Sequence, residues 1–176
     1  MRTDKEIFLA RLLRERDKFE WLINRAGSAR RMTVKGISGK WSIKDILARI
    51  LAYEQYLGDR MNELLHNEPY TPCTTQTALD AFLAEFGYPD FGSPLVDDDD
   101  LDTWIIEKYR NVALEDLIAQ EIQAFDVILT AFEKMPEEMI LRHNLYERIA
   151  DHTYRHYRDH AVVIKRWLRI QSPQTR

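Results

Sequence analysis

Four stretches of this 176-residue chain repeat apolar residues every three or four positions, and this pattern restricts the fold more than any other feature. Such spacing places the apolar side chains on one face of a helix. No segment shows the convincing alternation of apolar and polar residues that a half-buried strand would have. We therefore expect an all-α protein, a four-helix bundle that forms one domain over residues 1–176, with long helices near residues 3–27, 42–64, 113–135 and 144–170.

Local signals mark the ends of these helices. Thr3 and Glu6 have the spacing of a capping box, in which each side chain accepts a hydrogen bond from the backbone N–H group of the other residue. Pro136 ends the third helix, because proline lacks the N–H group that a continuing helix needs. We expect residues 137–143 to form a loop that leads to the last helix.

The connection over residues 67–111, between the second and third long helices, is a long crossover that several prolines and glycines interrupt. It has room for short helices near residues 77–86 and 101–109. The acidic run at residues 97–100 suits the start of a helix, and it lacks the glycine and the distal glutamate of an EF-hand calcium loop. Long connections are often functional, so we expect this one to cover a small-molecule pocket.

Composition excludes several classes of function. The formal net charge of -4, from 25 basic and 29 acidic residues, argues against a general nucleic-acid-binding protein. No apolar run approaches the roughly 20 residues that span a bilayer, and the charged N-terminal residues do not resemble a secretory signal. The single cysteine, Cys73, fits a reducing compartment. We expect a cytoplasmic protein whose partner is a small-molecule ligand, without a nucleic-acid or membrane partner.

Three histidines interrupt the apolar face of the last predicted helix. His152, His156 and His160 follow one another at i, i+4 and i+8, which places them within roughly 80° of each other around the helix. Apolar residues continue the same face in both directions, namely Leu145, Ile149, Val163 and Trp167. Imidazole nitrogens in a dry environment need partners. We expect His156 and His160 to lie side by side at a functional site, and a pair of core histidines with satisfied hydrogen bonds is the alternative.

A carboxylate interrupts the apolar face of each of the other three long helices, at Glu15, Glu54 and Glu121. Carboxylates and imidazoles from facing helices are the groups with which helical bundles bind divalent metal ions. The spacing of His156 and His160 lets two imidazoles on adjacent turns reach one ion, although the segment lacks the glutamate of the HExxH zinc proteases. Each glutamate also has a structural interpretation, in which its long side chain bends out to solvent.

Three segments resemble the DinB-like helical-bundle superfamily, and within it the ClbS/DfsB branch. They are GKWSIKDILARI at 39–50, YRNVALEDL at 109–117 and DHTYRHYRDH at 151–160. The resemblance implies a four-helix bundle with a divalent metal, commonly bound by one histidine of the second helix and two histidines of an HxxxH motif in the last helix. His156 and His160 match that motif, and Arg49 stands where the second-helix histidine is expected.

Arg49 is the important departure from the family pattern. A guanidinium group is always protonated and has no lone pair for a metal. We therefore expect a divalent metal, zinc or nickel, to bind weakly or not at all. The ligands would be His156, His160 and Glu54, with His152 as an alternative ligand. If the metal has been lost, Arg49 would make the pocket a receptor for anions.

Replacing Arg49 with histidine is expected to strengthen metal binding. The change removes a fixed positive charge near the dication and supplies a lone pair. Calorimetric titration of zinc or nickel into the wild-type and Arg49→His proteins measures the difference. Tight binding by the wild type through His156 and His160 would contradict this prediction and would favour a metalloenzyme.

The resemblance also implies an enzyme that modifies a small molecule, by hydrolysis or by thiol transfer. His156 and His160 would bind the metal or act as general acid and base. Glu54 would be a third ligand or a base, Tyr53 would donate a proton, and Arg49 would bind an anionic group of the substrate. Two other interpretations are open, namely a non-catalytic protein that binds a small molecule and a structural bundle that forms a homodimer.

Overall fold

The computed structural model describes residues 1–171, and its secondary structure in that range is helical apart from one isolated β-bridge between Ser38 and Trp41. In chain order the helices are α1 (Asp4–Ser28), α2 (Ile43–Leu65), α3 (Gln76–Phe86), α4 (Asp98–Tyr109), α5 (Leu114–Lys134), α6 (Glu137–Arg142), α7 (Leu145–His152) and α8 (Tyr154–Gln171). The predicted all-α class is confirmed. None of these helices is long and apolar enough to cross a membrane.

The described residues group into two compact units, and each has its own helices. Unit 1 contains Met1–Ile46 and the described residues from Glu137 onwards, and unit 2 contains Leu47–Pro136. The boundary falls within the first turn of α2. The predicted four-helix bundle and the predicted single domain each include helices of both units. The predicted domain also includes residues 172–176, which lie outside the described range. These two expectations stay predictions.

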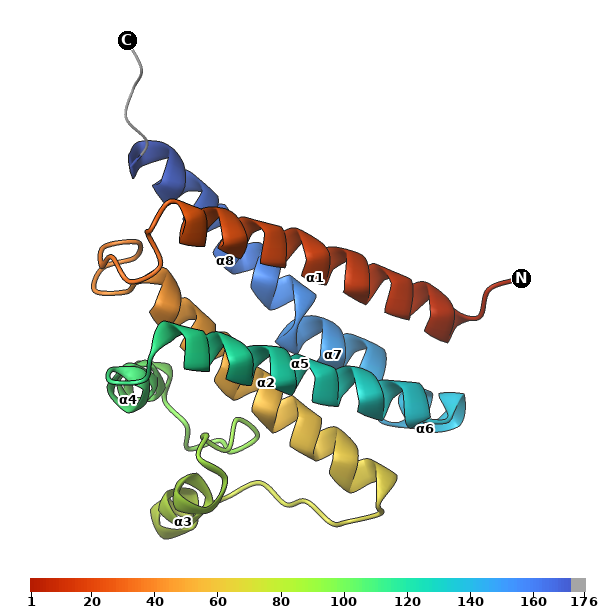
Figure 1. The fold of residues 1–176 in the computed structure, drawn as a ribbon. Helices are drawn as coiled ribbons and strands as arrows, with labels where there is room; N and C mark the ends of the chain where they lie inside the picture. Colours follow the sequence, from red (N-terminus) through yellow and green to blue (C-terminus); the bar gives the residue numbers. More distant parts are fainter. Residues whose placement is uncertain (172–176) are drawn as a thin grey trace. The chain divides into compact units, whose positions relative to one another are not determined.

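In unit 1, α1 packs along α8 (Figure 1). The predicted capping box is present at the start of α1, because the Thr3 side chain accepts a hydrogen bond from the Glu6 N–H group and the Glu6 carboxylate accepts one from the Thr3 N–H group. Phe19 of α1 stacks on Tyr157 of α8 with ring centroids 4.7 Å apart. The Tyr157 hydroxyl also accepts a hydrogen bond of 3.1 Å from Arg16. This aromatic contact and its polar partner fix α8 against α1.

The prediction of one continuous final helix is wrong, because the chain forms two helices there. The first, α7, ends at His152, and the second, α8, begins at Tyr154. Thr153 between them is fully buried and has a non-helical backbone, with φ -123° and ψ -100°. Its hydroxyl donates a hydrogen bond to the Ile149 carbonyl. This side-chain hydrogen bond competes with the backbone hydrogen bonds of a regular helix. His152 therefore belongs to a different helix from the two later histidines.

The loop expected at residues 137–143 contains a short helix, α6. Pro136 ends α5 as predicted and lies immediately before Glu137, the first residue of α6. Proline is tolerated at the start of a helix because the first N–H groups have no helical partner there. Glu137 and Glu138 lie in the first turn, where their negative charges suit the helix dipole.

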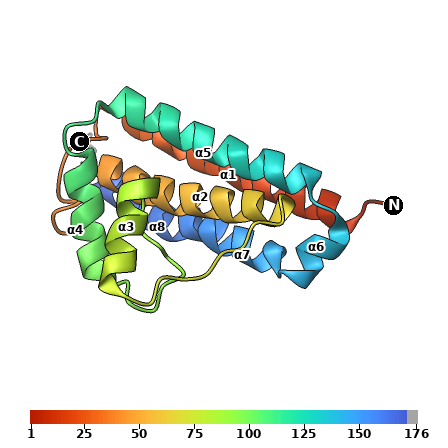
Figure 2. The same cartoon turned by 90° about the horizontal axis from the view of Figure 1, so that it is seen from below.

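In unit 2, α2 contacts α5 at Gly58 (Figure 2). A Cβ atom built on Gly58 would lie 3.0 Å from Val127 Cγ1, so the absence of a side chain allows the two helices to approach this closely. Apolar residues of both helices are fully buried in this unit, including Ile50, Leu57, Met61, Leu117 and Ile128.

The crossover of unit 2 contains the two predicted short helices, α3 and α4 (Figures 1 and 2). The acidic run begins α4, as predicted, because the Asp97 side chain accepts hydrogen bonds from the N–H groups of Asp99 and Asp100. Fully buried Asp90 holds the segment between the helices, since it accepts hydrogen bonds from the Tyr70 hydroxyl and from the N–H groups of Cys73 and Gly92.

Arg60 of α2 connects this helix to the crossover. Its side chain is only 3% exposed and makes two hydrogen bonds to Glu63, of 2.6 and 2.5 Å. The guanidinium carbon also lies within 6 Å of four aromatic ring centroids, those of Tyr56 (5.0 Å), Tyr70 (4.2 Å), Phe82 (5.6 Å) and Phe86 (5.9 Å). Planar arginine is suited to such a site, because it stacks on rings and binds a carboxylate with two N–H groups.

Candidate functional site

His156 and His160 form a direct pair on α8. Their ε nitrogens lie 3.0 Å apart, and their ring centroids are 4.6 Å apart with 51° between the ring planes. Both side chains are half-buried. The prediction that the two rings lie side by side is therefore confirmed.

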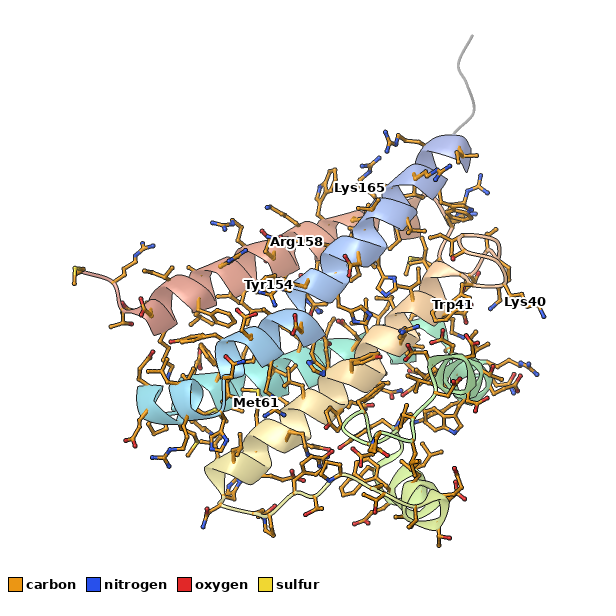
Figure 3. The ribbon with its side chains drawn as sticks, turned by 180° about the vertical axis from the view of Figure 1, so that it is seen from behind. Lys40, Trp41, Met61, Tyr154, Arg158 and Lys165 are labelled. Carbon is orange, nitrogen blue, oxygen red and sulfur yellow. The ribbon has the colours of Figure 1, made fainter. Side chains whose placement is uncertain are left out.

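One turn of α8 positions this pair. The N–H group of Tyr157 donates a hydrogen bond of 2.8 Å to the Thr153 carbonyl, which begins the helical ladder immediately after the break. Tyr154 and Arg158 lie on the same helix and are labelled in Figure 3. Tyr157 is buried against Phe19 and lies between the two histidines in the sequence. The packing of Tyr157 therefore sets the rotation of the helix turn that carries both imidazoles.

The pair has suitable spacing for two metal ligands but does not make a complete site. Two nitrogens that bind one zinc ion at about 2.0–2.1 Å lie about 3.0–3.4 Å from each other. Catalytic zinc sites use three protein ligands. Within each unit, the described residues contain no group of three or more His, Cys, Asp or Glu side chains that could hold a metal ion. The residues of unit 1 alone do not fit a metal centre, and weak metal binding stays a prediction.

His152, the alternative ligand, lies on α7, and the pair lies on α8. Its δ nitrogen contacts the Arg148 carbonyl at 2.8 Å, and burial lowers the pKa of its imidazole. The ring is therefore neutral at pH 7, with its δ N–H group donating to this carbonyl. The sequence did not predict the helix break between His152 and the pair, because the helical spacing of the three histidines continues through Thr153.

Arg49 and Tyr53 lie on α2 in unit 2. Arg49 donates a hydrogen bond of 2.5 Å to Asp102 of α4, and its guanidinium carbon lies 5.7 Å from the Tyr53 ring centroid. Tyr53 stacks on Phe91 with centroids 3.9 Å apart, and burial raises the pKa of its hydroxyl. Tyr53 therefore stays protonated and can donate a hydrogen bond. Asp102 was missed in the sequence, because its place in an acidic segment gave no sign of a partner 53 residues away.

Glu54, the third predicted residue of α2, is fully buried in unit 2. It lines a cavity of about 460 Å³ between α2 and α5, which we name the α2–α5 cavity. Phe86 at the end of α3 and Tyr88 shortly after it, both in the crossover, also line this cavity. The sequence predicted a small-molecule pocket covered by the crossover. The α2–α5 cavity is a pocket that two crossover residues line. Glu121 of α5 is also buried, as its position on the apolar face predicted.

Glu15 has a structural role in unit 1. It accepts hydrogen bonds of 3.0 Å from Arg158 and 3.1 Å from Lys18, and it lines a groove of about 290 Å³ between α1 and α8. The hydrogen bond from Arg158, assisted by Lys18, lowers the pKa of Glu15 to about 2 despite its burial. Glu15 therefore has a structural role, but it is buried with these partners and does not bend out to solvent as the structural alternative expected.

Replacing Glu15 with glutamine is expected to make unit 1 less stable at pH 7 and less sensitive to acid. The folded pKa of about 2 lies below the ordinary value of 4.5, so the ionised carboxylate contributes stability above pH 4.5, which is lost as the pH falls towards 2. Because Lys18 and Arg158 are 65% and 49% exposed, we discount this contribution to about 1–2 kcal/mol.

Urea denaturation between pH 7 and pH 2.5 measures this effect. Glu20→Gln is a matched control, because Glu20 also pairs with an arginine, Arg16, at 2.7 Å but is 48% exposed. Equal pH dependence of the wild-type and Glu15→Gln proteins would contradict the assignment.

Comparison with known family models, curated proteins and solved structures finds no match to this chain. The resemblance to the DinB-like superfamily stays a prediction from the sequence.

Proposed function

We propose that this protein is a small-molecule-modifying enzyme of the DinB-like type, in which His156 and His160 transfer protons during hydrolysis or thiol transfer. The observation that supports this proposal is the contact of 3.0 Å between the two ε nitrogens. Both residues are half-buried, so the pair is partly shielded and still accessible to a small molecule. Arg49, Tyr53 and Glu54 belong to unit 2, and the proposal does not depend on them.

The contact between the rings determines the chemistry of the pair. One ring must donate an N–H group and the other must offer a lone pair, so the contact needs one proton between the two ε nitrogens. A neutral imidazole can take a proton from water or from a thiol as that group attacks an electrophilic substrate. The protonated ring can then return a proton to the leaving group, and the pair regains its starting state. Histidine suits both steps because its ordinary pKa is close to neutrality.

An assay for both reactions tests the proposal. Hydrolysis of 4-nitrophenyl acetate and transfer of cysteine to 1-chloro-2,4-dinitrobenzene are measured with untagged protein. We expect turnover of at least one of these substrates above the buffer rate, and a loss of turnover when either histidine is replaced. A wild-type protein with no activity towards either substrate would contradict the proposal for these reaction classes.

A non-catalytic small-molecule-binding protein is the second candidate function. The α2–α5 cavity favours it, because a volume of about 460 Å³ lies within the range of roughly 300–1,000 Å³ typical of ligand pockets. Ligand binding that persists without turnover, and that does not respond to replacement of the histidines, would favour this function over the enzymatic one.

A further inference from the structure

We propose that the α2–α5 cavity binds a small organic cation, with an amine or amidine group attached to a flat apolar body. This inference goes beyond the proposed enzymatic function, because all residues that line the cavity belong to unit 2 and none is a histidine of the pair.

The polar groups of the cavity are suited to a positively charged donor. Glu54 and Asp59, both on α2, provide two carboxylates, and three glutamines are also among the lining residues. None of the described residues that line the cavity is lysine, arginine or histidine. Asp59 accepts a hydrogen bond from the Tyr88 hydroxyl, which stays neutral because burial and the neighbouring carboxylate raise the pKa of Tyr88. That contact orients the Asp59 side chain.

Gln55 gives an independent reason to expect a donor in the ligand. Its Oε1 atom is buried and has no hydrogen-bond partner among the described residues. Buried polar atoms in native proteins nearly always have a partner, and an exception calls for an explanation such as an absent ligand. Gln55 lines the cavity, so a change of its side-chain rotamer would turn this acceptor towards an N–H group of a bound ligand.

The remaining lining residues are suited to the apolar part of the ligand. Phe86 and Tyr88 present aromatic rings, and Val127 presents an aliphatic side chain. Aromatic rings attract an organic cation through their electron-rich faces. A divalent metal ion is a poorer candidate, because the described residues do not bring three carboxylate, imidazole or thiolate groups together here.

The charge of unit 2 favours the same class of ligand. Residues 47–136 contain 18 acidic and 5 basic side chains, so this unit is strongly negative. A field of this sign raises the local concentration of cations and repels anions, and added salt weakens both effects. An anionic ligand would meet an unfavourable field and two carboxylates.

Calorimetric titration with three ligands of matched shape tests the proposal. We expect 2-phenylethylamine to bind with a dissociation constant of about 1 mM or tighter, and neutral 2-phenylethanol and anionic 3-phenylpropionate to bind at least about tenfold more weakly. Benzamidine should bind like the amine. Affinity for both cations should fall as the salt concentration rises.

Variants locate the binding site. Asp59→Asn and Glu54→Gln keep the size of each side chain and should each weaken amine binding at least about tenfold. Ala119→Phe places a bulky side chain at an exposed residue of the rim and should block binding without disturbing the core. Asp126→Asn, at an exposed position of α5 outside the lining residues, is the matched control and should bind the amine like the wild type.

Two results would overturn the proposal. The first is a wild-type protein that does not prefer cations, either because it binds the amine and 2-phenylethanol with equal affinity or because the folded protein binds neither cation. The second is unchanged amine affinity in both Asp59→Asn and Ala119→Phe. Binding of the amine should persist in His160→Gln, which distinguishes a failure of this site from a failure of the proposed enzymatic function.

Discussion

Replacing Arg60 with alanine is expected to lower the free energy of unfolding by about 3–4 kcal/mol, a larger loss than most single substitutions cause. The side chain is 3% exposed, so its removal leaves a space in the packing and also leaves the partly buried Glu63 without its partner. Four aromatic rings lose their contact with the guanidinium group at the same time. The loss should be concentrated in the crossover, because three of these rings belong to residues 70–86.

Urea denaturation measures this loss, and hydrogen exchange shows where it occurs. Arg110→Ala is a matched control, because Arg110 also pairs with a glutamate three residues away, Glu107, but both side chains are more than half exposed. That pair should contribute less than about 1 kcal/mol. Arg60→Lys should keep the charge but recover only part of the stability, since lysine cannot bind a carboxylate with two fixed N–H groups. Similar losses in Arg60→Ala and Arg110→Ala would show that the ring contacts do not stabilise the protein.

Replacing His160 with glutamine is expected to reduce turnover in the active assay by about 100-fold or more. Positioned general acids and bases typically contribute 10²–10⁴-fold, and glutamine keeps a polar side chain but cannot take up a proton at neutral pH. His156→Gln should cause a similar loss. The double variant should lose little more than either single variant, because residues that act as a unit are strongly non-additive.

His66→Gln is the control for this experiment. His66 lies beyond the end of α2 and is exposed, and its δ nitrogen contacts the Asn62 carbonyl at 2.7 Å. It can act as a general base for an activated ester, as any exposed imidazole can, so its removal measures that background. A loss in His66→Gln equal to that in His160→Gln would show that the pair has no special reactivity.

Sequence patterns predicted those features that depend on neighbouring residues. The capping box of Thr3 and Glu6, the helix start at Asp97 and the pairing of His156 with His160 each involve residues no more than four positions apart. Helical geometry alone relates such residues, so their contacts follow from spacing.

The features that the sequence did not reveal depend on contacts between distant residues or on local competition. The partner of Arg49 is Asp102, and the rings around Arg60 extend to Phe86, so neither contact has a helical spacing. The break at Thr153 arises because a buried hydroxyl competes for a carbonyl, and threonine is common enough within helices that its presence did not mark an end. The α2–α5 cavity likewise depends on how two helices meet, since residues of both helices line it.

The histidine pair has a consequence for how such a site can arise. Both imidazoles stand on a single helix, four residues apart, and their separation is set within one turn. Two substitutions on an existing helix are therefore sufficient to create the contact, without remodelling of any loop or neighbouring helix. Such a motif can be acquired or lost quickly in evolution. It can also be transplanted, because an unrelated helix with a partly shielded face could carry the same His-x-x-x-His pair.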